Sequence, residues 1–440
     1  MNKAPGYKRW ETRPLECWNK AKELRRNLET SVPKAKEQGK LLADGANAAI
    51  ISGIANCQPV LSVPSGALIA NASPEFSRDC LSAAERRGFG RDSCGYYRAF
   101  YGSMLLNRTL SGGEYPRRDF TINTPAACDC HTKQVQQTAD HFKIPIFQWD
   151  QPQYIGPQNS ERDRLMLKHT VAQLLEQIEW LEKVSGRKFD DEKFREAVIN
   201  HIRHSSYRAE VARLQQNIPA PLDQKSIYSL FALGGVARTQ PQETEAFWRM
   251  VRDEVKWRVE NHIAAVGTER YRWLEDEPPP WYFLKYYRYM EKYGAVCIGS
   301  RYSLGTVNWE WREDGTYGPM KNPLELGWPM NTREEILRSQ IAAGRMLGRS
   351  LRADADLLTQ GMLDMAKAFH CDGAIMPLWL AGSGCTYGHR EAVLRLAKAG
   401  VNVMQYEGSQ AGDRTDFDES RMLDQLDDWM ESQGLRKLED

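Results

Sequence analysis

Several features that would place this chain in a familiar class are missing from its sequence. No apolar run of about twenty residues occurs, so we expect no membrane-spanning helix. The N-terminus, MNKAPGYKRWETR, lacks the apolar core of a secretion signal, which favours the cytoplasm. The net charge is only +1 and no dense basic run occurs, so we expect no nucleic-acid partner.

Recognisable catalytic motifs are also missing. The sequence has no GxxxxGK(S/T) phosphate loop, no HExxH and no GxSxG, which argues against nucleotide hydrolysis, zinc proteolysis and serine hydrolysis by this chain. It has no CxxC pair, which argues against zinc-finger, thioredoxin and ferredoxin sites. Its nine cysteines are an odd number in a large chain, which favours a few thiols as metal ligands over a disulfide framework.

The length and composition are those of a multi-domain globular protein. A chain of 440 residues exceeds one ordinary core, and 41% of its residues are apolar and 27% charged. The pattern predicts an α/β fold in three parts. Residues 1–160 form an N-terminal α/β domain with a helical lead-in, residues 161–280 a helical scaffold segment, and residues 281–440 a C-terminal α/β domain. Pro278-Pro279-Pro280 marks the second boundary.

Two stretches of the chain share one pattern. Residues Asp119–Asp150 predict a strand, a small-residue loop with Cys128, a helix and a second strand, and residues Gly373–Gly408 repeat this order around Cys385. Apolar strand residues follow each cysteine at 16 and 18 positions (Ile144 and Ile146; Val401 and Val403). The match favours a duplicated domain over a coincidence of length, although βαβ units vary little. Two facing units could then each supply one thiolate to a site between them.

A third cysteine, Cys94, also lies in a loop at a predicted helix start, where a thiolate is favoured. Three thiolates suit an iron–sulfur cluster that leaves one iron open to substrate. The spacing alone supports three inert, buried cysteines equally well. Zinc at Cys128-Asp129-Cys130-His131 is a further alternative, but we expect Cys130 to face away from Cys128.

The middle of the chain predicts helices with few chemically active residues. Ser160 begins a helix with one apolar stripe that Gly186 closes, and further helices span about Asp190–Gln216 and Gln242–Val266. The stripe consists of Leu167, Val171, Leu174, Ile178 and Leu181. Beyond the three prolines we expect one aromatic helix over Trp281–Tyr293 and a buried strand over Ala295–Ile298. A polar loop follows, and its Arg301 either contacts a ligand phosphate or belongs to an ordinary surface loop.

Three segments resemble a known family. They are Pro116-Arg-Arg-Asp119-Phe120 with Asn123-Thr-Pro-Ala-Ala-Cys128-Asp129, the run Asp92-Ser-Cys94-Gly-Tyr-Tyr-Arg-Ala-Phe, and the late strand–Cys385–helix–strand with Gln405-Tyr-Glu-Gly408. Over nearly the whole chain the sequence is similar to the family of 2-hydroxyacyl-CoA dehydratases and ATP-dependent (class I) benzoyl-CoA reductases. The Cys94 run and the aromatic segment Trp281–Tyr302 look closest to the B-type subunit of benzoyl-CoA reductase.

The resemblance implies two Rossmann-like α/β domains with parallel sheets and a 4Fe-4S cluster on three cysteines. The ligands would be Cys94, Cys128 and Cys385, possible supporting contacts would come from Asp129, and one iron would stay open. Two departures, the extra Cys130 and the Gly-Ser-Gly before Cys385, leave a larger bridged cluster open as an alternative. The proton donor and the substrate-binding residues are not identifiable, although His131 and His389 lie near the implied ligands.

The resemblance also implies partners and a reaction. The chain would pair with a homologous C-type subunit and receive low-potential electrons from ATPase subunits that carry their own 4Fe-4S cluster and are supplied indirectly by ferredoxin. The substrate would be benzoyl-CoA, reduced to cyclohexa-1,5-diene-1-carbonyl-CoA. Two alternatives remain. One is a 2-hydroxyacyl-CoA dehydratase subunit that recycles its electron, and the other is a cluster-free partner that only completes the acyl-CoA interface.

Overall fold

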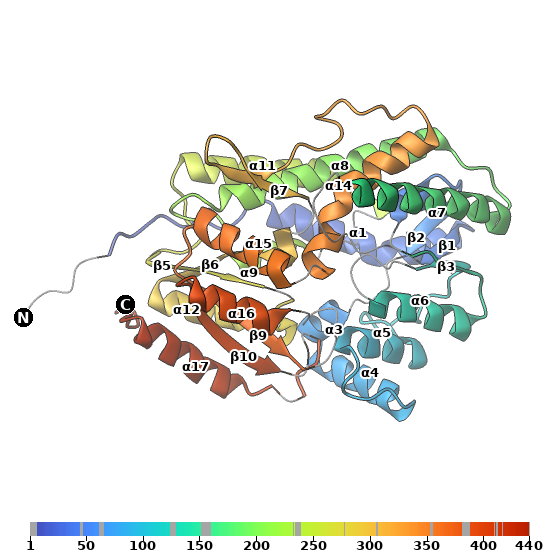
Figure 1. Ribbon diagram of the computed structural model, residues 1–440. Helices are drawn as coiled ribbons and strands as arrows, with labels where there is room; N and C mark the ends of the chain where they lie inside the picture. Colours follow the sequence, from blue (N-terminus) through green and yellow to red (C-terminus); the bar gives the residue numbers. More distant parts are fainter. Residues whose placement is uncertain are drawn as a thin grey trace, which may run out of the picture.

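Two parallel four-stranded sheets organise the protein. The computed structural model describes residues 7–44, 47–60, 66–123, 129–150, 160–231, 233, 239–276, 278–304, 307–352, 355–380, 388–408, 410, 412–415 and 417–439. The first sheet has the order β2-β1-β3-β4, and the second has the order β10-β9-β5-β6. Helices lie at the N-terminus, in the middle and around both sheets (Figure 1). The expected α/β class with parallel sheets and helical lead-in and middle segments is confirmed.

The bounds of the elements follow. The strands are β1 (Leu41–Asp44), β2 (Cys57–Val60), β3 (Phe120–Ile122), β4 (Ile146–Phe147), β5 (Tyr271–Glu275), β6 (Ala295–Ser300), β7 (Trp309–Trp311), β8 (Tyr317–Pro319), β9 (Gly373–Trp379) and β10 (Asn402–Gly408). The helices are α1 (Trp18–Glu37), α2 (Ala48–Ser52), α3 (Gly66–Ala72), α4 (Pro74–Arg86), α5 (Gly95–Leu105), α6 (Asp129–Phe142), α7 (Glu161–Ser185), α8 (Asp191–Leu214), α9 (Gln224–Phe231), α11 (Pro241–Glu260), α12 (Lys285–Met290), α13 (Arg301–Leu304), α14 (Arg333–Arg352), α15 (Ala355–Ala368), α16 (His389–Lys398) and α17 (Glu419–Ser432), with 3-10 turns η2 (Trp281–Phe283) and η3 (Glu291–Tyr293).

The two sheets have related strand orders. In the first sheet the order along the sheet is second, first, third and fourth strand of the chain, and in the second sheet it is fourth, third, first and second. In each sheet the third and fourth strands are parallel neighbours, and the described part of the connection between them contains a helix, α6 in the first sheet and α16 in the second. We call β1–β4 the first unit and β5, β6, β9 and β10 the second unit. The shared topology is what the repeated strand–cysteine–helix–strand pattern predicts.

Helix α7 forms as its sequence predicts. The Ser160 hydroxyl accepts a hydrogen bond from the Asp163 N–H at 3.2 Å, which satisfies one of the free donors at the helix start. All five residues of the predicted stripe are buried, and Gly186 ends the helix with a positive φ of 65°. The stripe packs on the first sheet, where Trp180 of the same helix contacts Phe120 and Phe147.

The aromatic stretch Trp281–Tyr293 differs from the expected single helix. It consists of η2, α12 and η3, and Gly294 ends it with a φ of 64°. Aromatic residues have only a weak preference for helix, so the packing of these rings into one core decides the local backbone. The second sheet also begins with β5, ahead of the boundary expected at residue 281.

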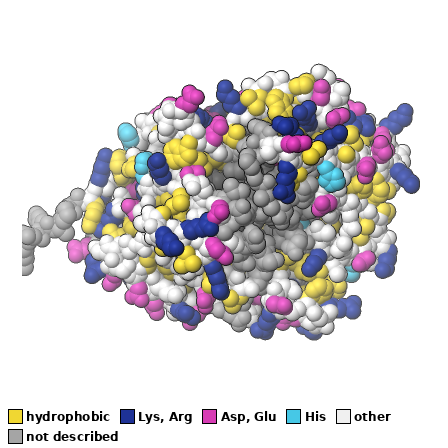
Figure 2. Space-filling view, in the orientation of Figure 1, with side chains coloured by type: hydrophobic (Ala, Val, Ile, Leu, Met, Phe, Trp, Pro, Cys, Tyr) yellow, Lys and Arg dark blue, Asp and Glu magenta, His cyan; other side chains and the backbone are white. Residues whose placement is uncertain are grey.

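Basic and acidic side chains are interspersed on the face of the molecule shown in Figure 2. Within the described ranges, no helix is both long enough and apolar enough to cross a membrane.

Candidate functional site

Cys94 lies where the two units meet. It is the residue directly before α5, and its side chain is only 6% exposed. The loop before it turns tightly, with the Ser93 N–H bonded to the Gly90 carbonyl at 3.0 Å. The thiol is therefore buried directly before the first residue of a helix.

The side chain that contacts the Cys94 thiol comes from the second unit. Gln410, which follows β10, is fully buried, and its Nε2 donates to the Cys94 Sγ at 3.6 Å. Its Oε1 accepts from the Gly95 N–H at 3.1 Å and from the Gly412 N–H at 3.0 Å. One amide thus holds the start of α5 against the loop after β10.

A buried ion pair reinforces this junction. The Arg98 guanidinium, one turn into α5, is 0% exposed and donates to Asp413, to Glu85 at 2.9 Å and to the Ser93 carbonyl at 3.1 Å. Burial raises the pKa of the Asp413 carboxyl, but hydrogen bonds from Thr415 and from Arg98 outweigh burial, so the pKa lies below its usual value. Asp413 is therefore the charged partner that Arg98 needs.

The other predicted ligands fall outside this description. Cys128 and Cys385 lie outside the described residues, as does the side chain of Asp129. Among the described side chains, no group of three or more His, Cys, Asp and Glu comes together as a metal site.

The described flanks of these segments lie beside the elements that carry Cys94 and Gln410. Helix α6, which begins directly after Cys128, packs on α5, and Cys130 lies close enough to Tyr97 to add to the raised pKa that burial gives the Tyr97 hydroxyl. Strand β9, which precedes Cys385, pairs Trp379 with Gly408 at the end of β10, and Gln410 follows two residues later.

A second buried polar group occupies the carboxyl end of the second sheet. Asp276, directly after β5, accepts from Arg301 Nε at 2.8 Å and from Nη2 at 3.0 Å, and His389 Nε2 lies 3.4 Å from its Oδ2. Burial raises the pKa of the Asp276 carboxyl, but Arg301 and His389 more than offset burial and hold it below its usual range. Arg301 is thus buried and paired with an acid, which contradicts the solvent-exposed loop, and its contact with a ligand phosphate stays a prediction.

Next to Asp276, Glu275 is held among tyrosines. The hydroxyls of Tyr286 and Tyr287 each donate to one of its carboxylate oxygens at 2.5 Å. Burial raises the pKa of Glu275 to about 7, although these tyrosine hydrogen bonds act in the opposite direction. This carboxyl group can therefore hold or release a proton near neutral pH.

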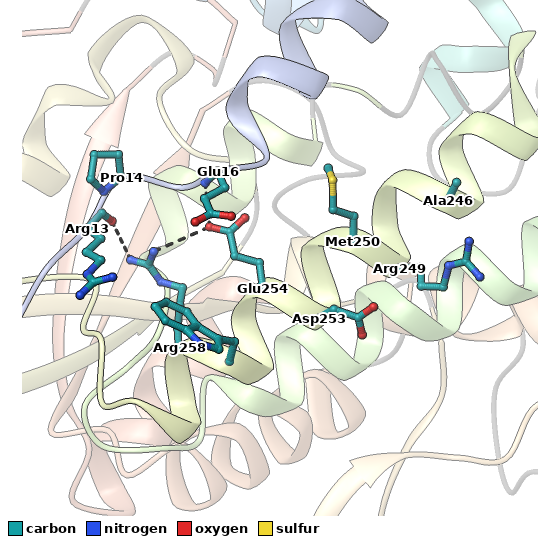
Figure 3. A pocket seen from close by; sticks show the side chains of 10 residues that line it. Arg13, Pro14, Glu16, Ala246, Arg249, Met250, Asp253, Glu254 and Arg258 are labelled. Carbon is teal, nitrogen blue, oxygen red and sulfur yellow. Dashed lines mark hydrogen bonds and ion pairs between the residues drawn. The ribbon is translucent and has the colours of Figure 1, made fainter.

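A surface groove lies in another part of the molecule. A cavity of about 750 Å³ is bounded by the segment before α1 and by α11, and its side chains are shown in Figure 3. Glu254 accepts from the Glu16 and Cys17 N–H groups, just before α1, at 2.8 and 3.0 Å. Arg258 donates to the Arg13 carbonyl at 2.9 Å (Figure 3). These contacts fasten the lead-in to α11, and none of the predicted ligands lines the cavity.

Sequence reasoning identified Cys94 but missed its partners. Gln410 is 316 residues away from Cys94, and nothing in the local sequence marks it. Glu275 and Asp276 were overlooked, although they begin a run of three acidic residues, Glu275-Asp276-Glu277, directly before the three prolines.

Comparison with known proteins gives a consistent family. The family described as "2-hydroxyglutaryl-CoA dehydratase, D-component" matches residues 65–432. The (R)-2-hydroxyisocaproyl-CoA dehydratase alpha subunit of Clostridioides difficile is 25% identical over 52% of this chain and 56% of its own length. The B-type subunit of the benzoyl-CoA reductase of Thauera aromatica is 25% identical over 56% of this chain and 58% of its own length.

A third relative is the alpha subunit of the (R)-2-hydroxyglutaryl-CoA dehydratase of Acidaminococcus fermentans, which is 26% identical over 38% of this chain and 34% of its own length. The chain spans about half the length of the curated relatives it matches. The family match, in contrast, begins after β2, covers the rest of the first unit and all of the second, and includes Cys94, Gln410, Glu275 and Asp276. The chain therefore belongs to the family of the 2-hydroxyglutaryl-CoA dehydratase D-component.

Proposed function

We propose that this chain is an iron–sulfur subunit of an enzyme acting on acyl-CoA thioesters, and specifically of an ATP-dependent reductase that converts benzoyl-CoA to cyclohexa-1,5-diene-1-carbonyl-CoA. The observation that carries the proposal is the buried Cys94 thiol directly before a helix, held by an amide donor. In support, α6, which follows Cys128, packs on α5, and β9, which precedes Cys385, pairs with the strand that leads to Gln410. The relatives, which include a benzoyl-CoA reductase subunit, support the acyl-CoA chemistry.

The residues around Cys94 suit a cluster ligand. Cys94, Cys128 and Cys385 would hold a 4Fe-4S group, which when bound supplies single electrons at low potential. The chain's own contribution is to present the Cys94 sulfur in a dry setting, since Cys94, Arg98 and Asp413 are all nearly inaccessible to solvent. Excluding water matters because a strong reductant would otherwise lose its electrons to side reactions.

The proposal includes partners. A homologous C-type subunit would complete the acyl-CoA pocket, and ATPase subunits with their own cluster, reduced indirectly by ferredoxin, would deliver the electrons. The relatives are themselves named as subunits, which supports assembly with other chains. The reaction balances when two electrons and two protons enter the ring for each diene formed.

The test is iron and sulfide analysis of the anaerobic complex. We expect Cys94→Ala, Cys128→Ala and Cys385→Ala each to lower cluster iron and to abolish ring reduction. Cys17→Ala is the matched control, because Cys17 is also a buried cysteine directly before a helix. Its thiol should stay protonated, since burial and, to a smaller extent, the nearby Glu254 carboxylate raise its pKa to about 12. Full iron and activity in all three variants would overturn the proposal, and an iron-free wild type would identify a cluster-free partner subunit.

A 2-hydroxyacyl-CoA dehydratase subunit is the second candidate. The observation in its favour is that the matching family and two of the relatives above carry dehydratase names. A dehydratase regenerates its electron after each loss of water, whereas ring reduction consumes it. Stoichiometric electron uptake with benzoyl-CoA supports the reductase, and catalytic electron use with a 2-hydroxyacyl-CoA supports the dehydratase.

A further inference from the structure

The side chain of Gln410 makes three contacts from one buried position. Its Oε1 accepts two backbone N–H groups, one from Gly95 and one from Gly412, and its Nε2 donates to the Cys94 sulfur. Gly95 and Cys94 belong to the α5 start, whereas Gly412 lies in the loop after β10. A single amide therefore joins two segments that are more than 300 residues apart.

The orientation of this amide is determined by its neighbours. Backbone N–H groups can only donate, so the atom that faces both Gly95 and Gly412 has to be the oxygen. The NH₂ group is consequently the one that faces Cys94. A sulfur that accepts from an amide is stabilised in its anionic form.

The glycines on either side leave the room that this arrangement needs. A Cβ on Gly95 would lie 2.8 Å from the Gln410 Oε1, and a Cβ on Gly412 would lie 2.5 Å from the Tyr96 ring. Larger residues at either position would push the amide or the loop away from the thiol. The close approach of the two backbone segments is thus built into the sequence.

We propose that Gln410 is a positioning residue for the Cys94 sulfur. From the second unit, its side chain holds the Cys94 sulfur in place and donates an N–H to that sulfur when Cys94 acts as a cluster ligand. The part that concerns the cluster rests on the proposed function. Hydrogen bonds to ligand sulfurs make a cluster easier to reduce, and contacts to the ligands raise retention of the metal. A residue of the second unit would therefore influence the reduction potential and the metal retention of a cluster whose ligand Cys94 comes from the first unit.

Two substitutions remove the donor in different ways. Gln410→Glu keeps an oxygen for Gly95 and Gly412 but replaces the donor with a second carboxylate oxygen, whereas Gln410→Met has a similar length and no charge. Gln405→Glu is the matched control, since it makes the same change on the exposed side of β10. If one variant fails to fold, the other still tests the proposal.

The measurements separate position from redox behaviour. In the metal-free full chain, hydrogen exchange should show that Gly95 and Gly412 are protected in the wild type and in Gln405→Glu, and that Gln410→Met loses this protection. In the anaerobically reconstituted complex, both Gln410 variants should shift the cluster midpoint potential to more negative values in an EPR-monitored titration. Resistance of the cluster iron to a chelator should fall by about 10–100-fold.

The outcomes distinguish this inference from the proposed function. A wild-type complex that holds iron, together with Gln410 variants whose potential and chelator resistance match the wild type, overturns the role of Gln410 and leaves the proposed function standing. A wild-type complex without iron overturns the proposed function and the cluster-ligand role with it. A potential shift as large in Gln405→Glu as in Gln410→Glu would show that charge near β10, rather than the donor to Cys94, controls the cluster.

Discussion

The two units share related strand orders but stabilise them with different side chains. The core beside the first sheet is mainly aliphatic, with α7, α8 and α14 supplying residues such as Leu181, Val198 and Leu337. The second sheet packs against two cores. The one that contains Trp273, Tyr286 and Tyr287 is mainly aromatic, and the other, which contains Val296, Ile298 and Leu358, is mainly aliphatic. One topology is therefore compatible with two kinds of core, as expected when strand order is set by connectivity and handedness rather than by particular side chains.

The difference extends to the buried charges at the strand ends. Both first strands end beside a buried acid that pairs with an arginine. In the first unit Arg118 Nε lies 3.6 Å from Asp44, and in the second Arg301 donates twice to Asp276 at 2.8 and 3.0 Å. The second unit adds Glu275 with its tyrosines. Tyrosine hydroxyls are what an aromatic core can offer to a buried carboxylate, and an aliphatic core offers none.

The largest effect is expected where the two units meet, at Arg98. Arg98→Met would leave Asp413 buried without its cation, and removing one partner of a buried pair costs roughly 3–5 kcal/mol. Denaturant unfolding of the metal-free chain measures this loss. Arg91→Met in the same loop is the control, since that side chain is 60% exposed and lies 3.7 Å from Glu85, so about 0.5 kcal/mol or less is expected.

A second substitution sharpens the result. Asp413→Asn in the Arg98→Met background removes the stranded carboxylate and should recover part of the lost stability. If Arg98→Met lowers the free energy of unfolding no more than Arg91→Met does, the Arg98–Asp413 ion pair adds little to the contact between the units. That contact would then depend on Gln410 and on apolar packing.

The next effect concerns the carboxylate found only in the second unit. The pKa of Glu275 is raised from 4.5 to about 7 by burial, so the folded state binds a proton that the unfolded state releases. The stability that this proton supplies is complete below about pH 4.5 and is lost as the pH rises through about 7. Relative to wild type, Glu275→Gln should therefore gain roughly 2–3 kcal/mol between about pH 5 and pH 8.

Unfolding free energies measured across this pH range test the prediction. Glu407→Gln, on the exposed side of β10, is the matched control and should follow the wild-type curve in parallel. A constant difference between Glu275→Gln and wild type at every pH would mean that Glu275 is not protonated in the folded protein near neutral pH.

The sequence predicted those parts of the fold that depend on neighbouring residues. The Ser160 cap, the apolar stripe of α7 and Gly186 lie within one helix, so their pattern is visible in a short window. Strand β5 was missed because Arg272 and Glu275 break its apolar pattern, and their compensating partners lie elsewhere. Arg272 donates to the Phe369 carbonyl, and Glu275 accepts from tyrosines of α12. Gln410 was missed for the same reason, because its partner Cys94 lies 316 residues away in the sequence.

The smallest effects test whether the two units share local rules despite their different cores. Ser160 caps α7 on the first unit, and Asp418 caps α17 on the second by accepting from the Arg421 N–H at 3.0 Å. Ser160→Ala should cost about 1 kcal/mol, because one N–H at the helix start loses its acceptor. Asp418→Ala should cost the same plus about 0.3–1 kcal/mol, because its negative charge also faces the positive end of the helix dipole.

Unfolding free energies measured at low and high salt separate the hydrogen-bond contribution from the charge contribution, since salt screens only the charge. A loss of stability in Ser160→Ala that depends on salt would contradict this assignment of the hydrogen-bond and charge contributions, and so would equal losses for both variants at low salt. Either result would mean that the stability of each cap depends on the core against which its helix packs, and not on one local rule.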